Sequence, residues 1–459
     1  ELMNKRIDTD SIGEIEVQED KYWGAQTERS LHYFSIGTDI MPSELVHALA
    51  IIKKSAALAN HELGMLTEDR CKLIVQVADE ILEGKLAEHF PLHVWMTGSA
   101  TQLNMNVNEV ISNRSIELAG GTMGSKSPVH PNDHVNMSQS SNDSIPTAMY
   151  ISTALAITHR LLPAVSFMKE ELAKKAEEWK GIIKIGRTHM QDAVPITLGQ
   201  EFSGYACMME DNIARLQWVL HDVMKLALGG TAVGTGINTP KGFAECVVKK
   251  ISDFTGLPFV PAPNKFCVQG AHDALVMVGG ALKTLANSMY KISNDIRLLS
   301  CGPRAGFHEL EIPSNEPGSS IMPGKVNPVI PESVAMVSAQ VTGLDAAVAM
   351  AGQSGNFQLN VMLPLVGANL LDMCGLLANA SNLLADKALQ GFTVNTENLN
   401  AGVGRNPVLV TALNPEIGYA LAADIAKEAY RSGRPVIDVA EERSGLSRKR
   451  LEVVDTAYS

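Results

Sequence analysis

Apolar residues recur every three or four positions along much of the chain, and this period predicts α-helices. Between residues 43 and 85 it predicts two helices joined near Gly64, because glycine adopts the backbone angles that end a helix. Between residues 147 and 179 it predicts one long helix, which Pro163 should kink or interrupt. Further helices are predicted at 199–229, 270–300 and 329–390. The pattern therefore predicts a mostly α-helical protein.

The helices predicted at 270–300 and 329–390 have few charges on any face. Such helices must be buried on all sides, and several of them suggest the core of an oligomer. Residues 346–371 carry no formal charge, but several amide side chains and Pro364 lie among them. Burying those amides in lipid would be costly, so we interpret the stretch as protein interior. After Gly391, charges and helix breakers become frequent, which indicates a small C-terminal domain.

The composition narrows the class of protein without identifying it. The chain has 459 residues, of which 45% are hydrophobic, so it can bury a large core. Its net charge of −12 argues against nucleic acids and anionic membranes as partners. The 6 cysteines lie far apart, and no spacing typical of a zinc or iron–sulfur site occurs. With no signal or transit pattern at the start of the sequence, we expect a reducing cytoplasm.

The segment Gly318–Pro328, Gly-Ser-Ser-Ile-Met-Pro-Gly-Lys-Val-Asn-Pro, has the residues of a reactive loop. Its glycines and prolines exclude a regular helix or strand. It is not a Walker loop, because five residues separate Gly318 from the next Gly-Lys pair and Val326 follows that pair. Lys325 and Asn327 suit a carboxylate, since one supplies positive charge and the other a directed donor. On composition alone, an ordinary polar turn is an equally good interpretation.

Two further clusters contain hydroxyl and amide side chains. Ser99 and Thr101 precede a predicted helix, where hydroxyls serve as N-caps about as often as they bind ligands. Ser140, Ser141 and Asn142 form a dense patch of donors that can hold a carboxylate. Both clusters are therefore candidate binding sites for an acidic ligand.

A histidine and a glycine-rich segment are the remaining candidates. His189 lies within Gly186–Pro195, beside Thr188, and a lone histidine of this kind is more often structural. Its unperturbed pKa nevertheless lets it take and give a proton near neutral pH. The segment Gly229–Gly236 lacks a third glycine in register and a preceding strand, so it predicts a turn rather than a dinucleotide-binding loop.

Together these segments resemble the fumarase/aspartase superfamily. The loop Gly318–Pro328 is similar to the signature loop of that superfamily, and Asn315-Glu316-Pro317 before it resembles class II fumarases in particular. The resemblance runs from about Arg6 to the end of the chain. It includes Tyr22–Thr27, Ser140–Asn142, Gly186–Pro195, Gly229–Gly236 and Ala262–Phe266.

The resemblance implies a lyase, fumarate hydratase, of the tricarboxylic acid cycle. This activity hydrates fumarate reversibly to (S)-malate by anti addition through a carbanion (aci-carboxylate) intermediate, with no metal and no organic cofactor. By resemblance, the catalytic residues are the base Ser319, the proton-transfer residue His189, its orienting partner Glu332, and Lys325. The implied substrate-binding residues are Ser99, Thr101, Ser140, Ser141, Asn142, Thr188, Ser320 and Asn327. An accessory carboxylate site is implied at His130, Asn132 and Asp133.

The resemblance also implies a mostly α-helical, three-domain fold with a central bundle of long helices. The expected domains are a mostly helical N-terminal domain at 1–138, the bundle at 139–394 and a small helical domain at 395–459. Four chains are expected to form a homotetramer in which three chains contribute to each active site, so isolated monomers should be inactive. The substrate is a small dicarboxylate. We expect a cytoplasmic location, with the mitochondrial matrix after presequence removal as the alternative.

Three residues depart from the family pattern. The family usually has glycine where this chain has Ala100, and a small polar residue where it has Leu103. Fumarases usually have lysine where this chain has Met137, and aspartases often have methionine there. Leu103 is expected to tighten or dry one wall of the pocket.

Three rival functions stay open. Aspartate ammonia-lyase, which makes fumarate and ammonia from L-aspartate, is favoured by Met137 and Val194, whereas Asn315-Glu316-Pro317, Lys265-Phe266 and His189 favour fumarase more strongly. A catalytically silent structural relative would be expected to have damaged reactive segments, and these segments are intact. Argininosuccinate or adenylosuccinate lyase would need a guanidino or nucleotide pocket, and the sequence reveals none.

Overall fold

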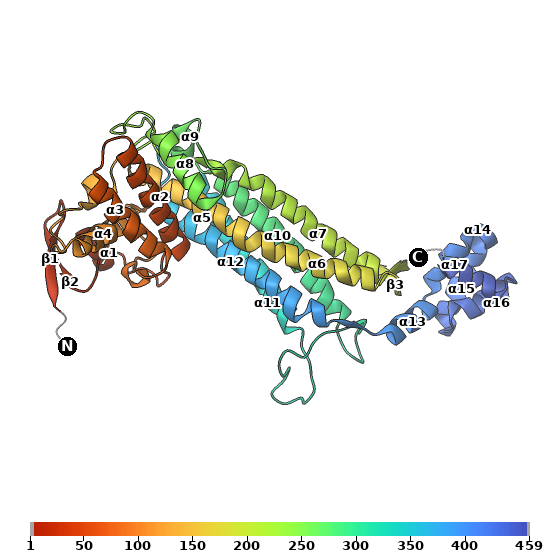
Figure 1. Cartoon of the computed structure of the whole chain (residues 1–459). Helices are drawn as coiled ribbons and strands as arrows, with labels where there is room; N and C mark the ends of the chain where they lie inside the picture. The colour runs from red at the N-terminus through yellow and green to blue at the C-terminus, as the bar shows by residue number, and fades with distance from the viewer. Residues whose placement is uncertain (1–3, 457–459) are drawn as a thin grey trace. The chain divides into compact units, whose positions relative to one another are not determined.

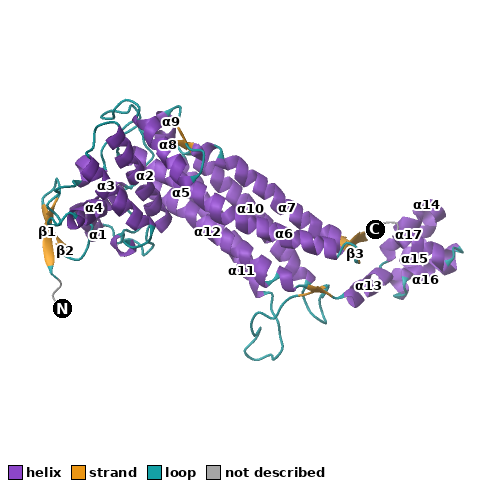
Figure 2. Ribbon diagram, viewed as in Figure 1, coloured by secondary structure: helices purple, strands orange, loops and turns teal. Residues whose placement is uncertain are grey.

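The computed structural model describes residues 4–456, which fold mainly into helices joined by loops and short two-stranded sheets (Figure 2). The predicted mostly α-helical class is confirmed. Packing divides the chain into two compact units. Unit 1 comprises the chain up to Leu162, Ala214–Thr284 and Gln340–Leu377, and unit 2 comprises Pro163–Ile213, Leu285–Ala339 and the chain from Ala378 onward. The three-domain division expected from the sequence stays a prediction.

Short elements come first in unit 1. Strands β1 (Lys5–Thr9) and β2 (Glu14–Gln18) pair in antiparallel register. After them come α1 (Ala25–Tyr33), α2 (Ser43–Glu62), α3 (Glu68–Leu82), the 3-10 helix η1 (Ala87–His89), α4 (Thr101–Leu118) and the π-helical turn η2 (Pro131–Val135). The two helices predicted between 43 and 85 are thus confirmed, and Gly64 between them has a φ of +76°.

Long helices dominate the chain between Ser141 and Lys387 (Figure 1). They are α5 (Ser141–Ala156), the π-helical turn η3 (Ile157–Leu161), α6 (Leu162–Glu178), α7 (Leu198–Leu220), α10 (Asp273–Leu299), α11 (Val329–Gly352) and α12 (Leu363–Lys387). The turn η3 ends two residues before Pro163, which has no N–H for the normal helical hydrogen bond. The interruption predicted from this proline is confirmed.

The uncharged stretch 346–371 is divided between two helices. α11 ends at Gly352 and α12 begins at Leu363, so a loop interrupts the stretch. This break agrees with its interpretation as part of the protein rather than as one continuous span. Among residues 4–456, three helical stretches would by length and composition alone suffice to cross a membrane, namely Ser141–Glu178, Val329–Gly352 and Leu363–Gly391.

Smaller elements complete both units. In unit 1 they are η4 (Asp222–Met224), β5 (Lys225–Leu226), α8 (Phe243–Thr255), β6 (Val260–Pro261) and α9 (Lys265–Gly270), with β5 and β6 parallel. In unit 2 they are the antiparallel pairs β3 (Ile183–Thr188) with β4 (Gln191–Thr197) and β7 (Leu310–Glu311) with β8 (Thr393–Val394), and the 3-10 helix η5 (Leu389–Gly391). The hydrophobic period had predicted no strand here.

The end of the chain is a set of short helices. They are α13 (Thr396–Arg405), the 3-10 helix η6 (Pro407–Leu413), α14 (Asn414–Ile417), α15 (Tyr419–Ser432), α16 (Val436–Ser444) and α17 (Arg448–Thr456). Ile425, Val436, Val439 and Leu451 belong to an apolar cluster buried among them. The change of character predicted after Gly391 therefore coincides with a change from long helices to short ones.

Candidate active site

The beginnings of α4 and α5 bring three hydroxyl side chains of unit 1 together. Thr101 opens α4 and Ser141 opens α5. Thr101 Oγ1 lies 2.8 Å from Ser99 Oγ and 2.8 Å from Ser141 Oγ, so the three hydroxyls form a hydrogen-bonded chain. Backbone N–H groups give a helix N-terminus a partial positive charge. Two neighbouring N-termini with hydroxyl donors are well suited to a negatively charged group.

Ser99 and Thr101 do not serve as helix caps. The N-cap position of α4 is occupied by Ala100, which has a φ of 53° and makes no side-chain cap. This left-handed conformation strains an L-residue but not glycine, which explains why a glycine is expected at this position. Leu103 is 1% exposed and belongs to the buried core.

Ser140 and Asp143 hold the first turn of α5. Ser140 Oγ accepts a hydrogen bond from the Asn142 N–H at 3.2 Å, and Asp143 Oδ1 accepts one from the Ser140 N–H at 2.9 Å. Asp143 Oδ2 accepts from the N–H groups of Gly229 and Thr231 at 3.0 and 2.9 Å. Burial raises the pKa of Asp143, while these backbone N–H groups lower it. The glycine-rich turn is therefore bound to the start of α5.

A pocket of about 470 Å³, which we call the hydroxyl pocket, adjoins these residues. Of the residues predicted to bind substrate, Thr101, Ser140 and Ser141 line it. Asn142 instead donates from Nδ2 to the Ala232 carbonyl at 2.8 Å, and Ala232 is part of the lining. Leu103 is not part of this lining, and its effect on the substrate pocket stays a prediction.

Sequence analysis missed several polar residues of the hydroxyl pocket. Asn104, Asn136 and Gln139 line it, and their amide oxygens accept hydrogen bonds from the Lys53 ammonium. Lys53 follows Leu49 by one helical turn and is fully buried, so it lies on the apolar face of α2. The signal in the sequence was Lys53 itself, a charged residue at a position where the helical period places apolar ones. It could have revealed this polar group.

The accessory residues lie at the start of the turn η2, where His130 is the N-cap and Asn132 and Asp133 belong to the turn. His130 Nδ1 accepts from the N–H groups of Asn132 and Asp133 at 3.0 and 3.2 Å. In the neutral ring the proton is therefore on Nε2, which makes that nitrogen the donor for a ligand. Asn132 lines the hydroxyl pocket, whereas His130 and Asp133 do not. The Met137 carbonyl accepts from Asn60 Nδ2 at 3.1 Å, so its backbone anchors the segment.

In unit 2, the loop Gly318–Pro328 is closed at its base. The Gly318 N–H donates to the Lys325 carbonyl at 3.0 Å, and Asn327 Nδ2 donates to the Gly318 carbonyl at 2.6 Å. At the other end, Ser319 Oγ accepts from the N–H groups of Ile321 and Met322 at 3.2 and 3.0 Å. Two donors aimed at one hydroxyl oxygen favour its negatively charged form. Ser320 and the Lys325 side chain are exposed.

His189 lies at the tip of the β3–β4 hairpin, a position that the sequence did not suggest. β3 ends at Thr188 and β4 begins at Gln191, so His189 and Met190 alone form the turn. Their φ angles are 55° and 62°, both in the left-handed region that a tight two-residue turn requires. Thr188 and His189 are exposed, so the imidazole is available to a partner or ligand.

A cluster of charges anchors the base of this hairpin. Lys184 is 1% exposed, and its ammonium is 2.8 Å from Glu201 and 2.5 Å from Glu309. Arg187 pairs with Glu309 at 2.5 Å and lies over the Phe307 ring. Charges paired in this way fix the direction of the hairpin. The turn with His189 therefore projects from a rigid support.

The proposed catalytic side chains of one chain do not contact one another. Glu332 lies half-buried in the first turn of α11. Within residues 4–456, the side-chain hydrogen bonds of Ser319 run to its own loop, and none joins Ser319, His189 and Glu332. A complete catalytic site thus requires further contacts between these side chains, which these hydrogen bonds do not supply.

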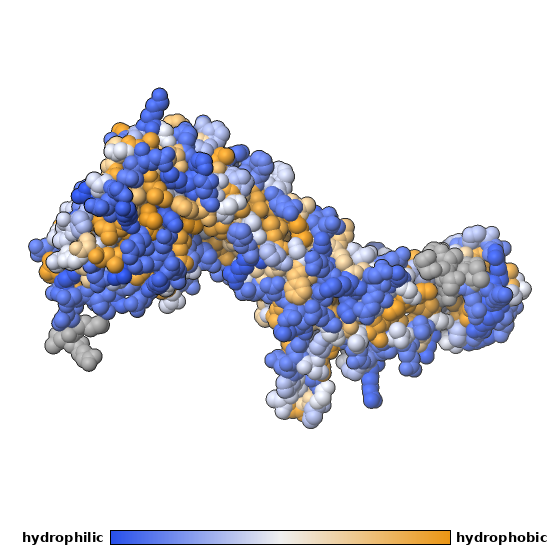
Figure 3. All heavy atoms as spheres, viewed as in Figure 1, coloured by the Kyte–Doolittle hydropathy of each residue, from blue (hydrophilic) through white to orange (hydrophobic). Residues whose placement is uncertain are grey.

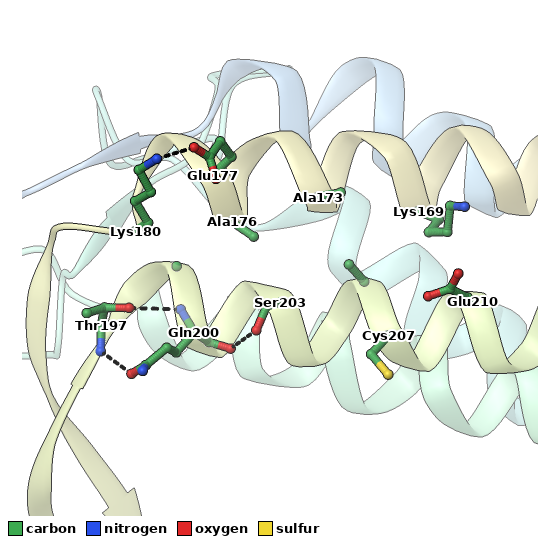
Figure 4. Close-up of a pocket in the computed structure, with 12 residues that line it drawn as sticks. Lys169, Ala173, Ala176, Glu177, Lys180, Thr197, Gln200, Ser203, Cys207 and Glu210 are labelled. Carbon is green, nitrogen blue, oxygen red and sulfur yellow. Dashed lines mark hydrogen bonds and ion pairs between the residues drawn. The ribbon is translucent and has the colours of Figure 1, made fainter. Parts of the chain in front are cut away.

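A larger groove, of about 640 Å³, lies between α6 and α7 in unit 2. Figure 4 shows its walls, with Lys169 near Glu210 and with Lys180 paired to Glu177. None of the predicted site residues is among those that line it. Its small side chains and opposite charges show no selective group for a dicarboxylate, so we do not assign the active site to it.

Comparison with known proteins places the chain in a family. Residues 13–343 match the family model described as "Lyase", and residues 409–455 match "Fumarase C C-terminus". The chain is 53% identical over 447 residues to a class II fumarate hydratase of Thermosynechococcus vestitus, covering 97% of this chain and 96% of the relative. It is 53% identical over 449 residues to the mitochondrial fumarate hydratase of Danio rerio, covering 97% and 88%.

The fold points to the same group of proteins. The crystal structure of a class II fumarase from Schistosoma mansoni superimposes with a TM-score of 0.95 at 41% identity, covering 99% of this chain and 98% of that one. Sequence and fold agree, and the chain belongs to the class II fumarate hydratase family.

Proposed function

We propose that this protein is a fumarate hydratase that interconverts fumarate and (S)-malate. The observation that carries the proposal is the environment of Ser319, whose Oγ accepts from the N–H groups of Ile321 and Met322. The difficult step is removal of a proton from a carbon next to a carboxylate, which demands a strong base. Two N–H donors, with Lys325 in the same loop, lower the free energy of the serine alkoxide.

In dehydration, the Ser319 alkoxide takes a proton from the methylene carbon of malate. The electron pair moves into the adjacent carboxylate and gives an aci-carboxylate, and the hydroxyl then leaves from the other carbon. His189 protonates the departing hydroxyl, so that water is released. In hydration the same imidazole takes a proton from the attacking water. Glu332 orients His189 and stabilises the imidazolium.

The two carboxylates of the substrate are held by hydroxyl, amide and ammonium donors. These are Ser99, Thr101, Ser140, Ser141, Asn142, Thr188, Ser320, Lys325 and Asn327. Preorganised donors matter most where charge develops, and removal of one typically costs about 10²–10³ in rate. The accessory residues His130, Asn132 and Asp133 form a second carboxylate site, in which His130 Nε2 is the donor.

We further propose a homotetramer in which each site combines segments near 141, 189 and 319 from three chains. The surface of α11 supports this proposal. The helix is apolar on most faces, and its side chains Met336 and Met350 are 68% and 65% exposed in the single chain. Apolar side chains also appear on the surface of the long helices in Figure 3. Exposed apolar faces of this kind are typical of subunit interfaces. Isolated chains would therefore be inactive.

The location inside the cell is also a proposal. One relative is named as mitochondrial, and bacterial proteins are among the others. A bacterial cytoplasm or a mitochondrial matrix agrees with these names. Fractionation of source cells, followed by detection of this chain, tests the assignment.

One assay separates this function from the aspartate alternative. Malate and L-aspartate are supplied separately to the purified protein, and fumarate is followed by its ultraviolet absorbance. We expect fumarate from malate only. Activity on aspartate alone would show an ammonia-lyase instead, and no activity on either would favour the catalytically silent relative.

A further inference from the structure

A lysine ammonium lies buried behind the wall of the hydroxyl pocket. Lys53 is 0% exposed, and its Nζ donates to Asn104 Oδ1 at 2.7 Å, Gln139 Oε1 at 2.9 Å and Asn136 Oδ1 at 3.1 Å. All three amide residues line the pocket, but Lys53 itself does not. The charge is thus separated from a bound ligand by a single layer of amide side chains.

The hydrogen bonds of these amides fix their orientation. Gln139 Nε2 donates to the carbonyls of Val135 at 3.1 Å and Met137 at 2.9 Å, so Gln139 Oε1 must face Lys53. Asn136 Nδ2 donates to the Gln139 carbonyl at 3.3 Å, which likewise turns its oxygen toward the lysine. Oxygen atoms cannot donate, so Lys53 supplies the proton in each of its three contacts. Asn136 Oδ1 also accepts from Asn104 Nδ2 and from Asn108 Nδ2, both at 3.1 Å.

The number of partners indicates the protonated form of Lys53. An ammonium has three N–H donors and the structure offers three oxygens, whereas a neutral amine has only two donors. Burial lowers the pKa of Lys53 to about 7, and the buried carboxylate of Asp143 raises it. Asp143 is itself held by the N–H groups of Ser140, Gly229 and Thr231, which partly compensate its charge.

The same contacts fix the segment that leads to the reactive hydroxyls. Asn136 and Gln139 belong to the chain directly before Ser140, and Lys53 links both of them to α2. Asn60, two turns further along α2, donates to the Met137 carbonyl at 3.1 Å and accepts from Ser138 Oγ at 2.8 Å. Lys53 and Asn60 therefore bind residues 136–139 at two positions along the same face of α2.

We propose that Lys53 is a positioning residue for dicarboxylate binding, an inference that rests on the proposed function. Its ammonium turns three acceptor oxygens away from the pocket, where they would repel a carboxylate. It also holds Ser140 and Ser141 in place and adds positive charge behind the pocket wall, in a medium that screens charge weakly. It does not touch the substrate.

The test compares Lys53→Met with Lys54→Met in the full-length protein. Lys54 is the next residue of α2, but its ammonium pairs with Asp79 at 2.7 Å, away from the pocket. Binding of succinate, a dicarboxylate that cannot react, is measured by calorimetry, and KM and kcat are measured with malate. We expect Lys53→Met to raise the succinate Kd and the malate KM by about tenfold or more, with a much smaller change in kcat.

A second variant keeps the test available if Lys53→Met does not fold. Lys53→Gln removes the charge but retains an amide donor, and we expect it to weaken succinate binding in the same direction. A folded neutral variant with an unchanged succinate Kd, or with reduced kcat and normal KM, would overturn the role of Lys53. Failure of the unmodified protein to act on malate would instead refute the proposed function, and the two outcomes are therefore distinguishable.

Discussion

At the scale of the residue, the proposed chemistry depends on the backbone N–H groups around one hydroxyl, that of Ser319. Ser319 receives N–H groups from Ile321 and Met322 because the loop turns back on itself directly after it. The turn is possible because Gly318, where an added Cβ would lie 2.2 Å from the Lys325 carbonyl oxygen, closes the base. The loop therefore holds the Ser319 hydroxyl in the environment that its proposed role as base requires.

Replacement of this hydroxyl tests its role. Ser319→Ala should leave folding intact and lower kcat on malate by about 10²-fold or more, because a proton-transfer group is lost. Ser314→Ala, in the same exposed loop, is the matched control and should retain its activity. Near-normal turnover in a folded Ser319→Ala protein would remove Ser319 from the mechanism.

A second residue makes folding sensitive to pH. Glu109 on α4 is 6% exposed and accepts from the N–H groups of Gln26 and Thr27 and from the Thr27 hydroxyl. Its carboxylate thus caps the start of α1. Burial is the larger effect and raises the pKa of Glu109 from 4.5 to about 7, while the three hydrogen bonds lower it. The folded chain therefore binds a proton that the unfolded chain releases.

The direction of the pH effect follows from linkage. Between pH 4.5 and 7 the folded state binds more protons than the unfolded state, so the contribution of Glu109 to stability falls as pH rises, by at most about 3 kcal/mol. Glu109→Gln removes this titration. The free energy of unfolding of both proteins is measured in denaturant at pH 5 and at pH 7.5. Relative to the unmodified protein, we expect Glu109→Gln to be more stable at pH 7.5 than at pH 5. A pH-independent difference would contradict this assignment.

At the scale of the element, close backbone approach holds the start of α4. The Gly98 carbonyl accepts from the Leu363 N–H at 2.9 Å, at the beginning of α12. A Cβ at Gly98 would lie 1.4 Å from the Val361 carbonyl oxygen, so no larger residue fits without backbone movement. The same segment continues directly into Ser99 and Thr101, which makes the hydroxyl pocket dependent on this contact.

Substitution at this contact should therefore affect both stability and binding. Gly98→Ala is expected to destabilise the protein by about 1–3 kcal/mol through overpacking and to weaken dicarboxylate binding by displacing Thr101. Gly204→Ala is the control, because Gly204 lies in α7 with no atom near its missing Cβ. The control should be neutral or slightly stabilising. Equal stabilities of the two variants would show that the backbone yields at Gly98.

At the scale of the whole molecule, the proposed site residues are distributed over both units of the chain. Thr101 and Ser141 meet in unit 1, whereas Ser319 and His189 lie on a loop and a hairpin of unit 2 without mutual contact. Assembly of several chains would combine these surfaces. The exposed methionines of α11 are the kind of surface that such an assembly buries.

Mixed tetramers test this arrangement. Ser319→Ala and His189→Asn chains, each inactive alone, are co-expressed with different tags and purified through both. If the two residues of one site come from different chains, about a quarter of the sites receive both native residues, and activity returns to that level. Doubly tagged Ser319→Ala tetramers are the control. The absence of any recovery would mean that one chain supplies both residues.

The sequence by itself determined where most helices lie, and it indicated which segments are candidates for the reactive ones. These properties are local, because Gly64, Pro163 and the glycines and prolines of Gly318–Pro328 act on their own backbone. Family membership also followed from local segments. The buried and exposed faces of α11 were not predictable in this way, since its residues are apolar on most sides.

Only the tertiary structure decided which distant groups meet. Hydrogen bonds between Thr101 and Ser141, or between Lys53 and Gln139, join residues far apart in the chain, and no spacing rule encodes them. His189 lies at a hairpin tip because β3 and β4 pair on either side of it, and the sequence analysis had predicted no strand in this segment. Local backbone preferences are written in the sequence, whereas the contacts that position the chemistry arise only when the chain packs.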